Sequence, residues 1–176
     1  EPGSYVAQDQ ALLVLAPAQG DAAHAEVQAQ LQDPDQIRAD LQRVKDRHAF
    51  TLDTARPGAM ARRHGQGSRS ARENIADLCD DGSFIEYGAL AIAAQTRRRS
   101  LDDLVANTPA DGMVTGMGSI NAAQFGTERS RAVIMSYDAT VLAGTQGARN
   151  HAKTDRMLGI ALQQKLPVVL FAEGGG

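Results

Sequence analysis

The chain has 176 residues, 43% of them hydrophobic, which is enough to bury the core of one ordinary domain. A formal net charge of −3 and an aromatic content of only 4% argue against nucleic-acid binding and give no general attraction to an anionic membrane. The single cysteine, Cys79, cannot form an internal disulfide. Because no apolar run approaches the length of a membrane span either, we expect a cytoplasmic protein.

The first part of the chain has the pattern of a tail followed by a linker. Residues 1–16 are rich in strand-forming residues but are too few to be stable alone, and residues 17–33 are rich in Ala, Gln and Asp. Asp33 and Pro34 suit the cap and the first turn of a helix. The apolar residues that follow recur at helical spacing and predict a stripe that docks on another surface: Ile37, Leu41 and Val44.

Residues 55–72 predict an exposed basic loop. Two interpretations stay open, contact with phosphate and a solvated connector. Ser70 and Glu73 then have the spacing of a capping box, which predicts a short helix through Cys79. The alternation of residues 83–87 predicts a strand. The basic side chains of the loop are Arg56, Arg62, Arg63, His64, Arg69 and Arg72.

The C-terminal half has the clearest pattern. Residues 113–120 and 131–137 predict two strands that pair antiparallel because a short loop joins them. Residues 138–147 form a loop with two glycines, and residues 150–165 predict a helix. Residues 168–172 are continuously apolar, as is typical of a strand covered on both faces. This order of elements predicts an α/β layer in which glycine loops gather where strands end.

The side chains of the usual catalytic sites are missing from the sequence. There is no nucleophile elbow, no zinc spacing and no P-loop, so we expect no metal ion in this chain. Glycines after a strand offer backbone N–H groups that can stabilise an oxyanion, although a plain tight turn is the commoner meaning of residues 174–176. Residues 143–147 precede a helix that carries Lys153 and Arg156, which suits either a phosphate-bearing ligand or a solvated first turn.

Several short segments, in the same order, resemble the carboxyltransferase domains of biotin-dependent acyl-CoA carboxylases. An Ala-Arg-Glu helix and an Asp-Gly-Ser-Phe turn are followed by an Asp-Gly-Met-Val-Thr-Gly strand, a Ser-Tyr-Asp strand end and a glycine turn. Glu-Gly-Gly-Gly then stands where that family has a Ser-Gly-Gly oxyanion loop. The resemblance runs over residues 68–176, in the segments 70–75, 81–86, 111–118, 136–141, 143–147 and 173–176.

The resemblance implies an α/β, crotonase-like fold of ββα units, present here in part, after a short β tail and a helical linker. It also implies transfer of CO₂ from carboxybiotin to the α-carbon of an acyl-CoA through an enolate, with the backbone amides of Gly175 and Gly176 as the catalytic groups. Biotin takes the α-proton, so no side-chain base is needed. The implied acyl-CoA contacts are Ala143, Gly144, Thr145, Gln146, Gly147 and Gly174, with Lys153 and Arg156 toward the CoA phosphates.

The sequence departs from the family pattern at Gly174, which replaces the usual Ser and follows the acidic Glu173. The acyl-chain preference therefore stays open. Residues 1–16 resemble the closing hairpin of a biotin carrier domain, with Ser4 and Asp9 in place of the usual Asp and Gly. The implied domains are the end of a carrier domain (1–16), a linker with one helix (17–67) and the first part of a carboxyltransferase domain (68–176).

We expect the chain to be part of a longer polypeptide and to be inactive alone. Biotin would be attached upstream, after a biotin carboxylase domain that uses ATP, Mg²⁺ and bicarbonate. The implied partners are acyl-CoA, the biotin carrier domain and the C-terminal half of a carboxyltransferase from another subunit, in a homo-oligomer. Two other interpretations are a crotonase-like acyl-CoA enzyme of hydration or decarboxylation, and a non-catalytic scaffold segment whose basic loop binds a partner.

Overall fold

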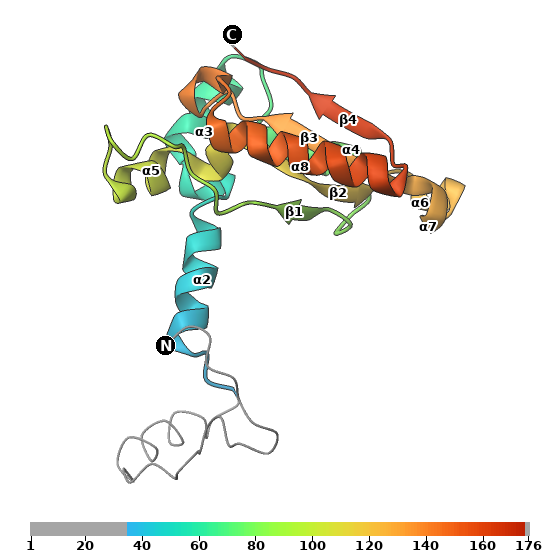
Figure 1. The fold of residues 1–176 in the computed structure, drawn as a ribbon, viewed down its shortest axis with the longest axis horizontal. Coiled ribbons are helices and arrows are strands. Elements are labelled where there is room, and N and C mark those ends of the chain that lie inside the picture. The colour runs from blue at the N-terminus through green and yellow to red at the C-terminus, as the bar shows by residue number, and fades with distance from the viewer. Residues whose placement is uncertain (1–34, 175–176) are drawn as a thin grey trace, which may run out of the picture. The chain divides into compact units, whose positions relative to one another are not determined.

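The computed structural model describes residues 35–174, which fold around one mixed sheet (Figure 1). The strand order is β1-β2-β3-β4, with antiparallel pairing of β1 with β2 and of β2 with β3, and parallel pairing of β3 with β4. This confirms the predicted α/β class and the predicted antiparallel pair. The strands are β1 Ile85–Tyr87, β2 Met113–Ser119, β3 Arg131–Tyr137 and β4 Val168–Phe171.

Three α-helices, α2 to α4, precede β1, and the others occupy the connections between the strands. The α-helices of the described residues are α2 Ala39–Ala49, α3 Pro57–Gly65, α4 Ala71–Leu78, α5 Leu101–Asn107, α6 Ala122–Phe125, α7 Thr127–Ser130 and α8 Ala148–Gln164. Three short 3-10 turns are η1 Asp53–Ala55, η2 Pro109–Gly112 and η3 Leu142–Gly144. Of these turns, η2 comes directly before β2 and η3 comes soon after β3.

The sheet buries both of its faces over β2 and β3, because α8 covers one face and α4 covers the other (Figure 1). Successive strand residues point to opposite faces, so the unbroken apolar run of β3 fits a strand between two layers. Each fully buried aliphatic side chain contributes about 1.5–3 kcal/mol to this arrangement. The α8 face holds Met113, Val133, Met135, Met157 and Ala161, and the α4 face holds Ala71, Ile75, Val114, Ala132 and Ile134.

A glycine in β2 lets the chain before β1 approach closely. A Cβ atom added at Gly116 would lie 2.6 Å from the ring of Phe84 and would collide with the carbonyl oxygen of Ile85. Only a residue without a side chain fits there. The glycine of the Thr-Gly-Met-Gly run is therefore explained by packing between strands.

The structure differs from the sequence prediction in the first helix and in the basic segment. Residues 35–38 are not helical and α2 begins at Ala39, while Asp33 and Pro34 lie outside the described residues. No residue of α2 is buried against the described chain, so the docking of its apolar stripe on another surface stays a prediction. Residues 57–65 form α3 instead of a loop, with Pro57 in the first turn, where its missing N–H costs nothing.

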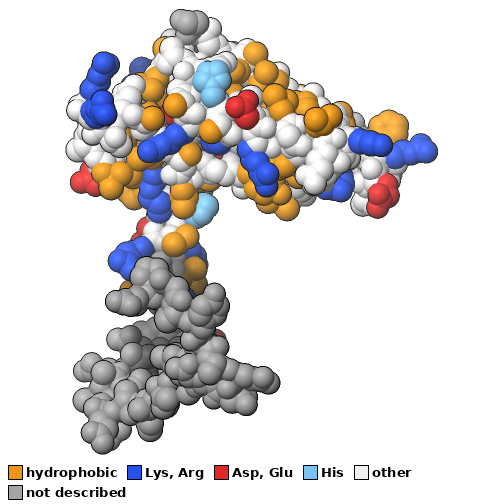
Figure 2. Space-filling view, viewed as in Figure 1, with side chains coloured by type: hydrophobic (Ala, Val, Ile, Leu, Met, Phe, Trp, Pro, Cys, Tyr) orange, Lys and Arg blue, Asp and Glu red, His pale blue; other side chains and the backbone are white. Residues whose placement is uncertain are grey.

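The last strand is only half covered. Its residues alternate between exposed and partly buried, with Val168 40% and Leu170 45% exposed, so the prediction of two covered faces is wrong for the described residues. The physical reason is that Val168 and Leu170 lie on the same face as Val133 and Met135, where α8 packs on β2 and β3 and leaves β4 open. Figure 2 shows apolar side chains gathered over this part of the molecule. Leu158 and Leu162 of α8 are also exposed.

The capping box of α4 is formed as predicted. The Ser70 hydroxyl oxygen accepts a hydrogen bond from the backbone N–H of Glu73 at 3.0 Å, and the Glu73 carboxylate accepts one from the Ser70 N–H at 2.7 Å. The same hydroxyl donates to Asp53 at 2.5 Å, and Ser70 is 2% exposed. This one side chain therefore joins α4 to η1.

We expect Ser70→Ala to lower the free energy of unfolding by about 1–2 kcal/mol, because it removes a helix cap and the hydrogen bond to the half-buried Asp53 carboxylate. Ser100→Ala is the matched control. Ser100 caps α5 in the same way, through the N–H of Asp103 at 3.2 Å, but it is exposed. Urea unfolding should show the larger loss for Ser70→Ala, and equal losses would contradict the proposed link to η1.

Candidate functional site

Two glycine-bearing segments that are thirty residues apart in the chain meet at the C-terminal end of β4. A Cβ atom added at Gly144 would lie 2.6 Å from the carbonyl oxygen of Glu173 and 2.9 Å from the Cα of Gly174. A Cβ atom added at Gly174 would lie 2.8 Å from the carbonyl oxygen of Gly144. The backbones therefore touch, and glycine is required on both sides of the contact.

The turn that presents Gly144 is left-handed over three consecutive residues. The φ angles of Leu142, Ala143 and Gly144 are 47°, 54° and 73°. Each non-glycine residue in this region costs of order 1 kcal/mol or more, and such positions persist where the surrounding structure over-determines them. Hydrogen bonds close the turn, from Gly144 N to Val141 O at 2.9 Å and from the Thr145 hydroxyl to Leu142 O at 2.7 Å.

An ion pair holds the chain just before this turn. Arg56 donates to the Asp138 carboxylate and to the Thr140 hydroxyl, each at 2.7 Å. Asp138 also accepts from the backbone N–H of Thr140 at 2.9 Å. The Arg56 and Asp138 side chains are only 11% and 8% exposed, so water screens this pair weakly.

The beginning of α8 fixes the other end of the turn. The buried Asp111 carboxylate accepts a hydrogen bond from the backbone N–H of Asn150 at 2.7 Å, and the Asn150 side chain donates to the Asp111 carbonyl oxygen at 3.2 Å. A Cβ atom at Gly147 would lie 3.0 Å from the same carboxylate. Asp111 therefore caps α8 across the chain, and Gly147 leaves the space for it.

The meeting of these segments leaves an open hollow of about 570 Å³ at the strand end. The residues that line it come from the end of β3, from the turn and from β4 and the residues after it. They are Tyr137, Gly144, Thr145, Gln146, Leu170, Ala172, Glu173 and Gly174. Four of the eight predicted acyl-CoA contacts, Gly144, Thr145, Gln146 and Gly174, thus line one hollow, while Gly175 and Gly176 lie outside the described residues.

The sequence of the chain matches the carboxyl transferase domain over residues 62–176. The chain belongs to this family. It is 33% identical over 120 residues to the propionyl-CoA carboxylase beta chain of Saccharopolyspora erythraea, in a match that covers 67% of this chain and 20% of that protein. The predicted family is therefore confirmed, whereas the predicted carrier tail at residues 1–16 lies outside the described residues and stays a prediction.

Solved structures agree with this assignment. A single-chain, multi-domain long-chain acyl-CoA carboxylase is 64% identical, with a TM-score of 0.78 over 80% of this chain and 14% of that chain. Transcarboxylase 12S with hydrolysed methylmalonyl-CoA bound is 30% identical, with a TM-score of 0.59 over 77% of this chain and 24% of that chain. The crotonase-like α/β fold is confirmed, and the chain spans about a fifth to a quarter of the length of the curated relatives it matches.

Lys153 and Arg156 of this carboxyl transferase domain lie apart from the hollow at Gly144. They line a smaller hollow of about 280 Å³ beside Gly88, and the two hollows share no lining residue. The Lys153 ammonium group donates to the carbonyl oxygen of Ala110 at 2.9 Å and to that of Met113. Its hydrogen bonds therefore support the turn before β2.

The basic side chains of the predicted loop are almost all paired within the chain. Arg63 pairs with Glu173, and also donates to the carbonyl oxygen of Arg69 at 2.8 Å. The other pairs are Arg56 with Asp138, His64 with Glu73, Arg69 with Asp77 and Arg72 with Glu86. No signal in the sequence identifies the Arg63–Glu173 pair, because its partners are 110 positions apart.

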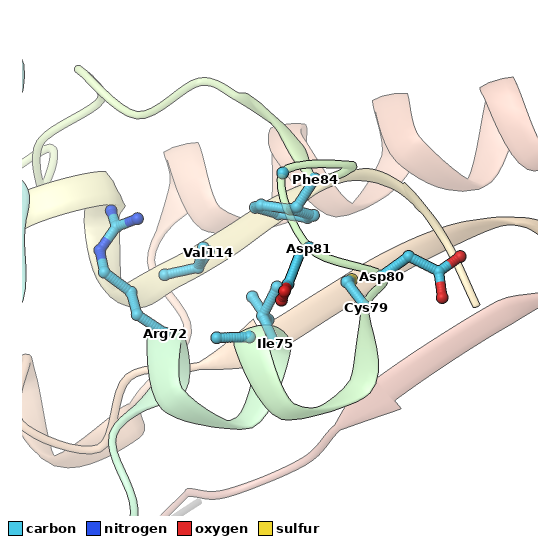
Figure 3. A pocket seen from close by; sticks show the side chains of 9 residues that line it. Arg72, Ile75, Cys79, Asp80, Asp81, Phe84 and Val114 are labelled. Carbon is cyan, nitrogen blue, oxygen red and sulfur yellow. The ribbon is translucent and has the colours of Figure 1, made fainter. Parts of the chain in front are cut away.

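A further hollow, of about 220 Å³, lies between α4 and the sheet. Figure 3 shows Ile75, Phe84 and Val114 around it, with Arg72 at one end and Asp80 at the other. Cys79 also lines it, and burial, with a smaller effect of Asp80, raises the pKa of its thiol. The protonated thiol is a poor nucleophile, which agrees with a packing role for Cys79.

Two further properties concern residues 35–174 only. No three His, Cys, Asp or Glu side chains gather there as a metal ion would require. No helix in the same stretch is long and apolar enough to cross a bilayer.

The burial of Lys153 predicts a pH dependence of stability. Burial lowers the pKa of its ammonium group from 10.5 to about 8, although the charges of Glu86 and Asp111 oppose the shift. Because the folded-state pKa is the lower one, the unfolded chain binds more protons between the two values, and stability rises with pH across that window. Its burial thus destabilises the fold below pH 8 by of order 3 kcal/mol, and this penalty fades toward pH 10.5.

Comparison with Lys153→Met isolates this effect. We expect the free energy of unfolding of the parent chain to rise relative to that of the variant as the pH increases from 7.5 to 10. Chemical denaturation at several pH values measures the difference. Lys45→Met, which removes an exposed lysine, is the matched control. A pH-independent difference for Lys153→Met would show that the ammonium group is not buried.

Proposed function

We propose that this chain supplies the acyl-CoA side of the carboxyltransferase site of a biotin-dependent acyl-CoA carboxylase. The observation that carries the proposal is the backbone contact between Gly144 and the Glu173–Gly174 segment. It brings the glycine turn 143–147 and the first glycine of the oxyanion loop to one hollow at the end of a strand. If no side chain acts as a base, the reaction needs a site whose acting groups are backbone N–H groups.

In the proposed reaction, the backbone N–H groups of Gly175 and Gly176 donate to the thioester oxygen of the acyl-CoA. The oxygen becomes more negative as the α-proton leaves and the enolate forms, so donors aimed at it favour the transition state over the substrate. The enolate α-carbon then forms a bond to the carbon of CO₂. The turn 143–147 lines the acyl-CoA site, and its close contact with Gly174 sets the direction in which the loop leaves β4.

Carboxybiotin, when bound, would supply the CO₂ by cleavage of its N–C bond, and the biotin ureido group freed in this way would take up the α-proton. The described residues contribute an aperture beside the strand end, and the one acidic residue that lines it, Glu173, is paired with Arg63. We assign ATP, Mg²⁺ and bicarbonate to a biotin carboxylase domain, as the resemblance to biotin-dependent carboxylases implies.

The exposed edge of β4 fits a further layer of protein. Relatives matched by this chain are four to five times longer than the matched part, and the exposed Val168 and Leu170 present an apolar surface. We assign this surface to the rest of the carboxyltransferase domain. Biotin would be bound mainly by the C-terminal half of a carboxyltransferase domain from another subunit. A solved relative, transcarboxylase 12S, is described as a hexamer, which supports a homo-oligomer.

The proposed contact of Lys153 and Arg156 with CoA phosphates requires the ligand to reach the hollow beside Gly88. Lys153 meets this requirement least well, because its ammonium group already has two carbonyl partners. Arg156 is exposed and free to turn toward solvent. The scaffold interpretation loses its support, since it rested on exposed arginines and most of these are paired inside the chain.

Gly144→Ala tests the proposal. The added Cβ atom would meet the carbonyl oxygen of Glu173, and the φ of +73° is unfavourable for alanine, so the turn and the strand end must separate. In the complete carboxylase that contains this chain, we expect the rate of acyl-CoA carboxylation to fall about 100-fold, as small displacements of positioned groups do.

Gly159→Ala is the matched control for this experiment. Gly159 lies in the middle of α8, and an added Cβ atom meets nothing within 4 Å. We expect unchanged carboxylation and an increase of about 0.5–1 kcal/mol in stability, from the better helix propensity of alanine. Full carboxylase activity of Gly144→Ala would contradict the proposed site.

A further inference from the structure

Glu173 poses an electrostatic problem at the proposed site. This acidic residue comes directly before Gly174 and is one of the residues that line the hollow at the strand end. A negative charge there opposes the negative charge that develops on the thioester oxygen, and like charges repel more strongly in a site shielded from water. An acidic residue at this position therefore requires compensation if the loop is to stabilise an enolate.

Arg63 is placed to provide that compensation. Its guanidinium group pairs with the Glu173 carboxylate, and the Nε atom of the same group donates to the carbonyl oxygen of Arg69 at 2.8 Å. The side chain of Arg63 is 14% exposed and that of Glu173 is 34% exposed. The pair is thus sheltered on the arginine side and held from two directions, unlike an ordinary surface ion pair.

The backbone of Glu173 is constrained at the same time. Its carbonyl oxygen lies against Gly144, at 2.6 Å from where a Cβ atom would be, so the peptide unit has little freedom to rotate. The turn thus fixes the point of the main chain from which the Glu173 side chain extends. The ion pair with Arg63 then holds the carboxylate and neutralises its charge.

We propose that Arg63 is a positioning residue for the carboxyltransferase reaction, which neutralises the Glu173 carboxylate beside the developing enolate. The inference rests on the proposed function. Arg63 touches neither substrate nor reacting atoms, and it acts only through Glu173. This role of Arg63 gives a functional reason for the ion pair between α3 and the chain just after β4, which are far apart in the sequence.

The experiment compares four variants of the complete carboxylase that contains this chain, with steady-state kinetics for acyl-CoA. We expect Arg63→Gln to lower kcat about 10- to 100-fold and to change KM by less than about threefold, because the charge matters most in the transition state. Arg63→Lys keeps the positive charge and should retain most of the activity. Arg63→Gln combined with Glu173→Gln should recover most of the parent kcat, since no charge is left to neutralise.

Arg62→Gln is the matched control, because Arg62 is exposed on the same helix and does not line the hollow. It should leave kcat and KM unchanged. Thermal unfolding of each variant separates a loss of folding from a loss of charge compensation. The comparison of kcat requires that the Arg63→Gln protein is folded. If that variant unfolds, Arg63→Lys and the double variant provide the same test.

The outcomes are distinguishable. Full activity of folded Arg63→Gln in an active carboxylase would overturn this inference and leave the proposed function intact. Loss of activity in Arg63→Gln without recovery in the double variant would also overturn it, since a merely structural role would not respond to the charge of residue 173. A parent enzyme that binds acyl-CoA but does not carboxylate it would overturn the proposed function, and the inference with it.

Discussion

The interaction on which the rest of the structure depends is the one between the Asp111 carboxylate and the first turn of α8. Asp111 is 2% exposed and Asn150 is fully buried, and together they exchange a backbone and a side-chain hydrogen bond. An unpaired carboxylate at this depth would cost several kcal/mol, so the helix and the turn before β2 stabilise one another. Lys153 reinforces the same turn from one helical turn further along, through the carbonyl oxygens of Ala110 and Met113.

The interaction of Asp111 with α8 also constrains the hollow at the strand end, because two left-handed turns pack against each other. Residues 110–112 and 142–144 all have positive φ angles, and a Cβ atom at Gly112 would lie 3.3 Å from the side chain of Val141. The first turn is held by α8, and the second lies between β3 and α8. Strain of this kind persists only where neighbours fix it. Its consequence is that Gly144 is presented to the end of β4 in one fixed orientation.

The sequence predicted the parts of this arrangement that local rules control. The Ser70–Glu73 capping box, the antiparallel pair β2–β3, α8 and the α/β class follow from spacing and hydrophobic period. It did not predict α3, because glycines and charges in residues 57–65 hide a helix that the rest of the chain stabilises. The sequence also did not predict the pair of Arg63 and Glu173, since charges 110 positions apart meet only after the sheet has formed. Likewise, the apolar run of β4 cannot reveal that its strand is an edge.

The electrostatics of the site follow from the interactions in which the nearby charged groups are already engaged. The N-terminus of α8 would attract an anion through its helix dipole, but the Asp111 carboxylate occupies that end and cancels much of the potential. The positive charges of Lys153 and Arg63 are directed to backbone carbonyls and to Glu173. Little free charge therefore faces the hollow at the strand end. Under the proposed function, a developing oxyanion there is stabilised by aligned peptide N–H groups, whose value depends on rigidity more than on charge, and the two fixed turns would provide that rigidity.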